Sequence, residues 1–265
     1  SDYFNTITYS GNGSNPRTLT GVGFQPDWVW QKNRTDGNGH TLADAVRGAN
    51  KTLSSDGNGA EVTDKSDGHL DAFTSDGFTV GAGSSSDARV NDGSHTYVAW
   101  NWKANGAGSS NSDGSVTSTV SANTTAGFSI VTWTSTGSAH TVGHGLGSTP
   151  AMIIMKGRHE TNNWMVYHHK NTSAPETDYL TLDDTAPTGD HPVWNDTAPT
   201  SSVFSLGTWS GNDASGTMVA YCFAEKTGYS KFGSYVGNSS TDGAFVYTGF
   251  KPAFILIKKT DTTKN

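Results

Sequence analysis

Short segments in which hydrophobic and polar residues alternate follow one another along the chain, separated by turns rich in glycine, serine, asparagine and aspartate. In residues 27–32, Trp28, Trp30 and Lys32 share one face of an extended strand, and Val29 lies on the other. Residues 151–156 and 253–258 have the same register and are hydrophobic on both faces. Because no stretch longer than about ten residues has the hydrophobic spacing of a helix, the pattern predicts an all-β protein whose central strands are covered on both faces.

A recurring spacing divides the chain into copies of one unit. An aromatic residue is followed 17 residues later by a proline, in Tyr9–Pro26, Trp133–Pro150 and Tyr235–Pro252. A glycine stands three residues before each proline, and a lysine stands six residues after it, at Lys32, Lys156 and Lys258. Agreement at three kinds of residue without gaps indicates a repeated sheet-forming unit.

The first two copies also match further along, where residues 76–81 align with 202–207 and residues 97–103 align with 218–224. Strand-rich units of roughly 100 residues are typical of small sandwiches. The sequence therefore predicts tandem β-sandwich repeat modules of the jelly-roll, lectin-like kind. The expected parts are a first sandwich at 1–104, a Gly/Ser-rich linker at 105–125, a second sandwich at 126–226, and the start of a third, truncated repeat at 227–265.

Four tryptophans in patterned strands are expected to belong to the core rather than to a ligand site. Trp100 and Trp102 form a pair that resembles a sugar-stacking platform, but the second copy has Tyr221 and Phe223 at these positions. Exchange among bulky apolar groups fits packing better than recognition of one ligand. The same interpretation applies to Trp28 and Trp30.

Composition excludes several classes of protein. Hydrophobic residues make up 33%, charged residues 15% and aromatic residues 11% of the chain, which suits short strands and tight turns. The net charge of −7 argues against a nucleic-acid partner. No apolar run approaches the roughly 18 residues of a membrane span, so membrane insertion is not expected. Cys222 is the one cysteine, which excludes a disulfide framework and indicates a buried thiol.

The chain shows no recognisable catalytic motif. No nucleophile elbow stands between a strand and a helix, and Glu61, Glu160 and Glu176 lie outside the strongly patterned strands. We therefore expect no enzyme activity and name no catalytic residue. His140 and His144 would share a face only on a helix, which the neighbouring glycines oppose, so they are expected at the surface and no metal site is predicted.

No cofactor is expected, although calcium is a weaker alternative. Carboxylate and amide oxygens on loops are the ligands that calcium prefers, and the chain offers them in several turns. The same residues are ordinary turn formers. The turns concerned are residues 64–68, Asp190, Asn195–Asp196 and Asn212–Asp213.

A candidate glycan site is expected where the copies differ, because loops between rigid strands carry function. Trp164, Trp194 and Trp209 have no aromatic counterpart in the first copy and lie beside polar stretches. Aromatic rings next to hydrogen-bonding groups are typical of saccharide sites. His168 and Arg158 complete the candidate set. The alternatives are that the rings cap the core beneath loops and that Arg158, which matches Arg34, makes a structural pair at a strand end.

Four segments carry a resemblance to a known group of proteins. Residues 23–30, 96–103, 141–147 and 229–235 resemble repeat modules in proteins of marine bacteriophages, which are regarded as virion appendage or tail-fibre-like proteins. The resemblance covers essentially the whole chain. It implies a viral structural protein on the surface of the virion and supplies no catalytic residues.

The leading hypothesis is a fibre or adhesin region that binds host cell-surface glycans and contacts other virion proteins. By analogy with fibres we expect a homo-oligomer, with a homotrimer favoured. One alternative is a purely architectural capsid or tail decoration protein without a ligand, which predicts that Trp164, Trp194 and Trp209 are buried. Another is a polysaccharide depolymerase, which predicts a groove lined by two carboxylates of raised pKa.

Overall fold

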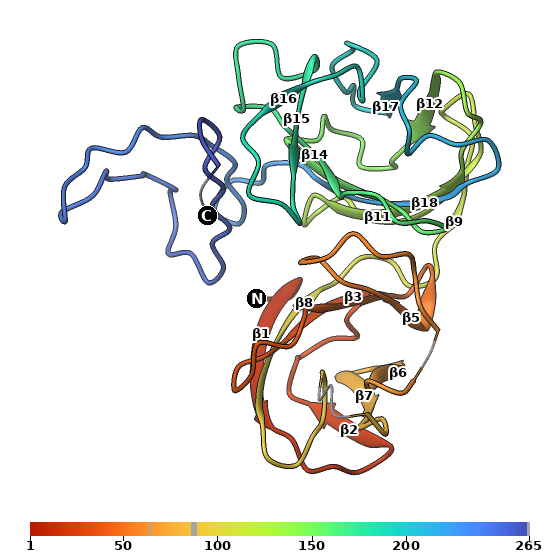
Figure 1. The fold of residues 1–265 in the computed structure, drawn as a ribbon, viewed down its shortest axis with the longest axis vertical. Helices are drawn as coiled ribbons and strands as arrows, with labels where there is room; N and C mark the ends of the chain where they lie inside the picture. Colours follow the sequence, from red (N-terminus) through yellow and green to blue (C-terminus); the bar gives the residue numbers. More distant parts are fainter. Residues whose placement is uncertain (64, 86–88, 264–265) are drawn as a thin grey trace.

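The structure, a computed structural model, describes residues 1–63, 65–85 and 89–263. The described residues form strands, turns and irregular segments, so the prediction of an all-β sandwich protein is confirmed (Figure 1). Among these residues there is no helix with the length and apolar character needed to cross a membrane.

The first unit is a sandwich of a five-stranded sheet and a three-stranded sheet. The larger sheet has the order β1-β8-β3-β4-β5 and the smaller one the order β2-β7-β6. The strands are β1 (Phe4–Ser10), β2 (Arg17–Thr20), β3 (Trp28–Asn33), β4 (Thr41–Asp44), β5 (Gly48–Leu53), β6 (His69–Thr74), β7 (Gly77–Gly81) and β8 (Thr96–Trp102).

The second unit pairs an eight-stranded sheet with a two-stranded one. The larger sheet has the order β16-β15-β14-β13-β18-β11-β10-β9, and the smaller one consists of β12 and β17. The strands are β9 (Ser109–Asn111), β10 (Ser118–Asn123), β11 (Phe128–Thr134), β12 (His140–Gly143), β13 (Met152–Gly157), β14 (Met165–His168), β15 (Asp178–Thr181), β16 (Gly189–Asp190), β17 (Val203–Leu206) and β18 (Thr217–Phe223).

Segments that the recurring spacing aligns occupy equivalent places in the two units. The order β1-β8-β3-β4-β5 corresponds to β11-β18-β13-β14-β15, and the pair β2-β7 corresponds to β12-β17. After each proline the next amide donates to the last residue of the central strand: Asp27 N to Trp102 O at 2.8 Å, and Ala151 N to Phe223 O at 2.7 Å. The surroundings of Pro26 and Pro150 are therefore alike.

The predicted linker at 105–125 is wrong over the residues that form two strands. Strands β9 and β10 lie within it, and β10 pairs with β11 along its whole length, from Ser118 opposite Trp133 to Asn123 opposite Phe128. Val120 and Ser121 are buried. The polar composition misled because β10 is held between β9 and β11 by its backbone, and Ser118 and Ser121 are buried within the sheet.

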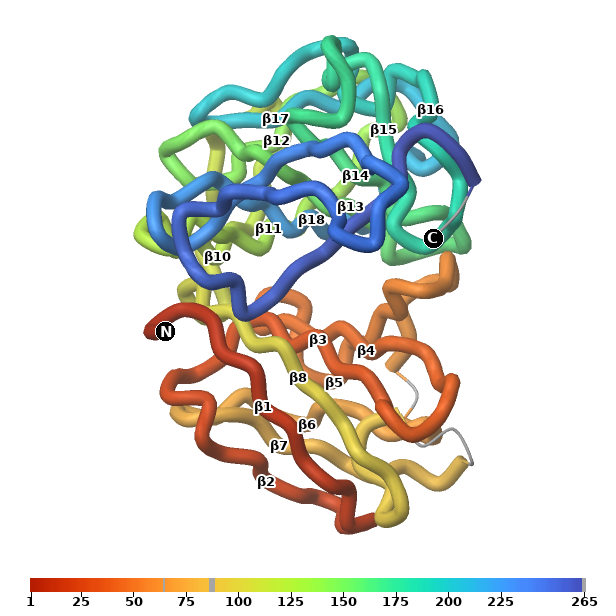
Figure 2. The backbone as a smooth tube through the Cα atoms, turned by 90° about the vertical axis from the view of Figure 1, so that its left-hand side faces the viewer, coloured from red at the N-terminus to blue at the C-terminus, as the bar shows by residue number. Residues whose placement is uncertain are grey.

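The predicted strand at 253–258 is not formed. The described residues from 231 onward contain no strand, and they lie to one side of both units (Figures 1 and 2). In the first two copies the equivalent strands, β3 and β13, pair with β8 and β18. Among the described residues no strand lies beside 253–258, so the backbone of this segment has no ladder to join.

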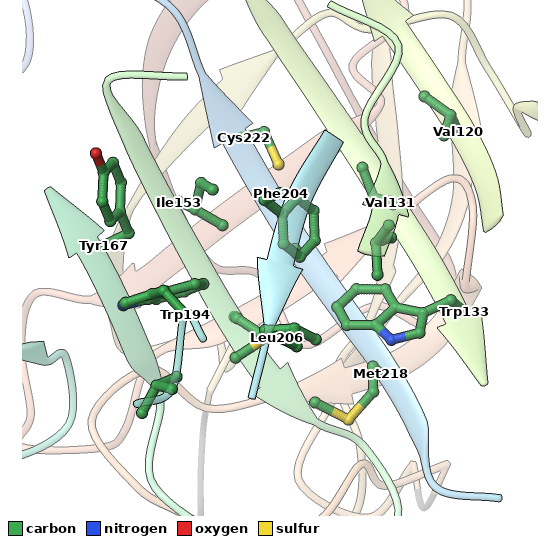
Figure 3. Packing of buried hydrophobic residues seen from close by; sticks show 14 of the residues in the cluster. Val120, Val131, Trp133, Ile153, Tyr167, Trp194, Phe204, Leu206, Met218 and Cys222 are labelled. Carbon is green, nitrogen blue, oxygen red and sulfur yellow. The ribbon is translucent and has the colours of Figure 1, made fainter. Parts of the chain in front are cut away.

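Three apolar cores lie between four layers of strands. One core fills the first sandwich around Phe78, and another fills the second sandwich around Phe204 (Figure 3). A third core lies between the five-stranded and eight-stranded sheets, which face each other (Figure 1). We call it the inter-unit core. Its buried residues are Trp28, Trp30, Leu42, Leu53, Trp102, Ala104, Phe128, Ile130, Ile154, Trp164, Val166, Leu180, Val219, Tyr221 and Phe223.

Trp28 is the centre of the inter-unit core. Its ring stacks on Tyr221 of the second unit with centroids 4.2 Å apart, and it also contacts Trp102 and Phe128. The expectation that Trp28, Trp30 and Trp102 are packing residues is confirmed by their exposures of 1%, 6% and 7%. Trp100 is partly buried against the same core.

Lys32 and Lys156 close the loops that follow strands β3 and β13. Lys32 Nζ donates to the carbonyl oxygens of Asn33, Asp36 and Asn38. Lys156 Nζ donates to Gly157 O, Glu160 O and Asn162 Oδ1. Burial lowers the pKa of Lys156 to about 8, although Asp183 and Glu160 oppose the shift. Both lysines therefore have a structural role in these loops.

The inter-unit core yields a test of stability. Trp28→Ala is expected to lower the free energy of unfolding by about 3–5 kcal/mol, because it removes a buried ring and leaves a cavity. Tyr247→Ala, at a residue that is 78% exposed, serves as the control and should change stability by less than about 0.5 kcal/mol. Chemical denaturation measures both. A cost for Trp28→Ala no larger than that of the control would contradict the packing described here.

Candidate functional site

The three tryptophans predicted to stack on sugars are buried. Trp164 is 0%, Trp194 is 1% and Trp209 is 8% exposed, so none offers a ring face to a ligand. This part of the predicted glycan site is wrong. Polar flanking residues suggested exposure, but the rings turn inward because each belongs to an apolar core.

Each of the three rings has an identifiable structural role. Trp164 lies in the inter-unit core, and its Nε1 donates to Ser54 O of the first unit at 2.8 Å. Trp194 packs edge-on against Tyr167 in the core of the second sandwich (Figure 3). The Trp209 ring covers Gly211 so closely that a Cβ there would lie 2.1 Å from it. The rings therefore hold loops and units together.

Arg158 joins the two units through Glu61. Its Nε donates to Glu61 Oε2 at 2.9 Å and its Nη2 donates to Glu61 Oε1 at 2.8 Å. Arg158 O also accepts from Glu61 N. This two-pronged contact agrees with the alternative that Arg158 makes a structural pair at a strand end.

Glu61 also belongs to a buried polar network that sequence reasoning missed. Arg47 Nη1 donates to Glu61 Oε2 at 2.9 Å, and the Arg47 guanidinium pairs with Asp44. Tyr221 Oη donates to Asp44 and accepts from Arg47 Nη2 at 3.1 Å. Burial opposes the charge on Arg47, but Asp44, Tyr221 and Glu61 outweigh it and raise the pKa of the guanidinium. Asp44, Arg47 and Glu61 stand in no recognisable motif, so only the fold reveals them.

A small polar hollow adjoins Arg158. Its volume is about 240 Å³, and its polar lining is mostly hydroxyl groups. Thr132, Thr134 and Thr217 project from neighbouring strands on the side of the sheet that also carries Ile130. We call it the hydroxyl hollow. The lining residues are Thr117, Ser118, Thr119, Thr132, Trp133, Thr134, Arg158 and Thr217.

A larger hollow lies between the C-terminal segment and the open side of the inter-unit core. Its volume is about 1490 Å³, and its exposed lining is mainly apolar. We call it the aromatic hollow. Aromatic rings of both units line it, including Phe4, Trp28, Trp30, Trp102, Phe128 and Phe223, together with residues of the segment 228–257.

His168 borders the aromatic hollow. Its ring lies near Phe232 and His169, and it is half-buried. Burial, assisted by His169, lowers the pKa of His168 to about 4, so the imidazole is neutral near pH 7. The five predicted site residues are thus dispersed: His168 lines one hollow, Arg158 lines the other, and the tryptophans lie inside.

His140 and His144 are buried, whereas the sequence predicted them at the surface. Their exposures are 7% and 0%. His140 Nδ1 lies 2.8 Å from Ser138 O, and His144 Nε2 lies 3.2 Å from Thr200 O. Burial lowers the pKa of His144. Gly137 and Gly145 have positive φ values of 74° and 67° and form turns on either side of β12, so both histidines belong to a strand and its end rather than to an open loop.

One group of side chains in the described part of the chain has the arrangement of metal ligands. His159, Glu160 and Asp213 offer ligand atoms within 4.8 Å of one another. Two of the three residues are exposed, and Glu160 Oε1 already accepts from Asn162 Nδ2 at 2.8 Å. Asp213 comes from one of the turns considered for calcium, whereas Asp64 lies outside the described residues. The geometry permits a cation here but shows no enclosed binding site.

The Glu61 network predicts a dependence of stability on pH. Burial favours protonation of Glu61, but Arg158 and Arg47 outweigh it and hold the pKa of Glu61 below its usual 4.5. The carboxylate therefore stabilises the folded protein above pH 4.5, and this contribution is lost as the pH falls through the lowered pKa. At pH 7, Glu61→Gln is expected to lower the free energy of unfolding by about 1–3 kcal/mol.

Glu225→Gln is the matched control for this experiment, because Glu225 pairs with the exposed Lys231 and should matter by less than about 1 kcal/mol. Denaturation curves between pH 3 and pH 8 compare the variants with the unmodified chain. A Glu61→Gln effect that is constant across this range would contradict the proposed role of the ionised carboxylate.

Comparison with known proteins identifies a family without assigning an activity. The family described as a domain of unknown function, DUF7483, matches residues 1–265. No curated protein and no solved structure matches the chain. Because the match extends over all of its residues, the chain belongs to the DUF7483 family.

Proposed function

We propose that the chain is an architectural component of a virion, a rigid β-sandwich segment of an appendage or decoration on the particle surface. The observation that carries this proposal is the burial of Trp164, Trp194 and Trp209. These rings were the features that favoured a ligand-binding protein, and they serve instead to pack the two units. The resemblance to phage appendage modules supplies the virion setting.

The packing of the units supports a load-bearing role. Their large sheets meet across an apolar core, and the Asp44–Arg47–Glu61–Arg158 network adds charge-assisted hydrogen bonds beside it. An interface of this kind resists relative movement of the units. A spacer requires such rigidity, whereas a ligand-binding lobe does not.

The two hollows give no support to a polysaccharide depolymerase. Burial raises the pKa of Asp27 and Asp183, as an acid catalyst would require. Asp27, however, accepts from Ala104 N, and Asp183 accepts from Trp164 N. Neither carboxyl lines the aromatic or the hydroxyl hollow. Both groups therefore fit a structural role.

The architectural proposal predicts where the chain occurs. Mass spectrometry of purified particles of a phage that encodes the chain should detect it in multiple copies per particle. Cryo-electron microscopy of the same particles should locate its paired sandwiches on the tail or capsid surface. Absence of the chain from extensively purified particles would overturn the virion role.

Glycan binding is the second candidate function, now centred on the hydroxyl hollow. Hydroxyl groups and Arg158 around a shallow cavity suit hydrogen bonding to sugar hydroxyls. Its volume lies below the roughly 300–1,000 Å³ of sites for drug-sized ligands, which favours a single sugar residue. Multivalent display on a particle would strengthen such weak contacts.

A glycan array probed at high protein density tests this second candidate. Bound signal is expected to fall at least tenfold in the double variant Thr132→Val and Thr134→Val, because the hollow loses two hydroxyls. The matched control replaces Thr18 and Thr79, which face each other on strands β2 and β7, with valine and should leave the signal unchanged. An array without signal, or equal loss in both variants, would remove glycan binding from consideration.

A further inference from the structure

The amine of Lys156 is buried among neutral groups. Its side chain, near the end of β13, is fully buried. Nζ donates to the carbonyl oxygens of Gly157 and Glu160 at 2.6 Å and 3.0 Å, and to Asn162 Oδ1 at 2.7 Å. These acceptors are two backbone carbonyls and a side-chain amide, so none of them carries a charge. Burying an ammonium group in such surroundings is costly, which favours its conversion to a neutral group.

The same burial makes the amine of Lys156 reactive. It lowers the pKa of Lys156 to about 8, against the opposing effects of Asp183 and Glu160. His159 and Asp213 are the titratable groups beyond Glu160, with His159 Nε2 3.6 Å from Glu160 Oε1. Near pH 8 an appreciable fraction of the molecules therefore holds a free amine, which is a nucleophile.

The side-chain amide of Asn162 is fixed between Lys156 and Glu160. Its Oδ1 accepts from Lys156 Nζ, and its Nδ2 donates to Glu160 Oε1 at 2.8 Å. A Cβ on Gly157 would lie 2.6 Å from Nδ2, and one on Gly211 would lie 2.9 Å from it, so a side chain at either position would displace the amide. Since Cγ is bonded to Oδ1 at about 1.23 Å, Lys156 Nζ lies within about 4 Å of this carbon.

We propose that Lys156 and Asn162 are the site of an intramolecular isopeptide bond, formed with Glu160 as the residue that transfers the proton. The free amine attacks Asn162 Cγ, and a bond forms between Nζ and Cγ. One proton passes from Nζ to Nδ2 through the Glu160 carboxylate, the bond between Cγ and Nδ2 breaks, and ammonia leaves. An amine and a primary amide thus become a secondary amide and ammonia, without an oxidant, a reductant or a cofactor.

The product suits the buried site better than the ammonium group does. The charge is gone, and the remaining N–H can donate to Gly157 O or Glu160 O, which already accept from Nζ. The new bond closes a ring over the loop that carries Arg158, whose guanidinium binds Glu61 of the first unit. This inference goes beyond the architectural role and does not depend on a virion setting.

The first copy supplies an internal comparison. Lys32, Asp36 and Asn38 have the same spacing as the three residues of the proposed site. Lys32, however, is only partly buried, and its Nζ donates to the backbone oxygen of Asn38. The Asp36 carboxylate pairs with His95 Nε2 at 2.9 Å. Because amine, amide and carboxylate are not brought together there, no bond is expected in the first copy.

Mass spectrometry of the unmodified chain tests the proposal. Under denaturing conditions its mass is expected to be lower than that of the sequence by one ammonia. Acylated Lys156 resists trypsin, so the peptide 104–158 should be recovered joined to the peptide 159–170 through Asn162. Cyclisation of an asparagine that precedes a glycine also releases ammonia, but it leaves Lys156 cleavable. The joined peptide is therefore the decisive product.

Variants of the two copies separate the chemistry from folding. Glu160→Gln keeps an oxygen that can accept from Asn162 Nδ2 but cannot transfer the proton, so it should slow formation of the joined peptide at least tenfold at pH 8. Asp36→Asn, the matched change in the first copy, should leave the rate unchanged. Lys156→Arg should yield no joined peptide. Formation is followed after cell-free synthesis, and hydrogen exchange of β11 and β18 verifies folding.

The pH dependence provides a further check. Formation should be faster at pH 9 than at pH 6, because the free amine of Lys156 is more abundant at the higher pH. Three outcomes would overturn the proposal: separate peptides after prolonged incubation of the folded chain at pH 9, an equal rate in Glu160→Gln, or an equal rate in chain kept unfolded. Since each measurement uses the isolated chain, failure here leaves the architectural proposal standing.

Discussion

The structure depends on the contact between two large sheets that are each covered on both faces. Trp28 stacking on Tyr221 is the centre of this contact, and rings from β8, β11 and β18 surround it. A lean hydrophobic content suffices because a few large rings supply much of the buried area. One face of each large sheet is covered by the small sheet of the same unit, and its other face is covered by the large sheet of the other unit.

Polar groups at the same interface add specificity of alignment. Arg47 reaches from the first unit to Tyr221 of the second, and Arg158 reaches back to Glu61. Burying these charges is favourable only while all partners are present, since a lone buried charge is strongly destabilising. The network therefore selects one placement of the units, whereas the aromatic core alone would tolerate several.

The sequence predicted strands better than it predicted exposure. Alternation and the recurring spacing identified the strands around Trp28, Met152, Trp100 and Tyr221, because side-chain period and turn chemistry are local properties. The linker prediction failed because strand β10 pairs through its backbone, which composition does not reveal. The expectation that Trp164 stacks on a sugar was wrong because its ring is buried, with Nε1 donating to Ser54 O, 110 residues away in the chain. The prediction of a strand at 253–258 was wrong because, among the described residues, no neighbouring strand pairs with this segment.

The connection between the two sandwiches has a mechanical consequence. Residues 103–108, which join β8 to β9, form no strand, but Lys103 N donates to Tyr3 O, Ala104 N to Asp27 Oδ2 and Asn105 N to Ser121 Oγ, so the crossing is hydrogen-bonded to both units. Bending the two units relative to each other would require these hydrogen bonds and the contacts of the inter-unit core to break. A torque applied to one unit would therefore pass to the other through this contact.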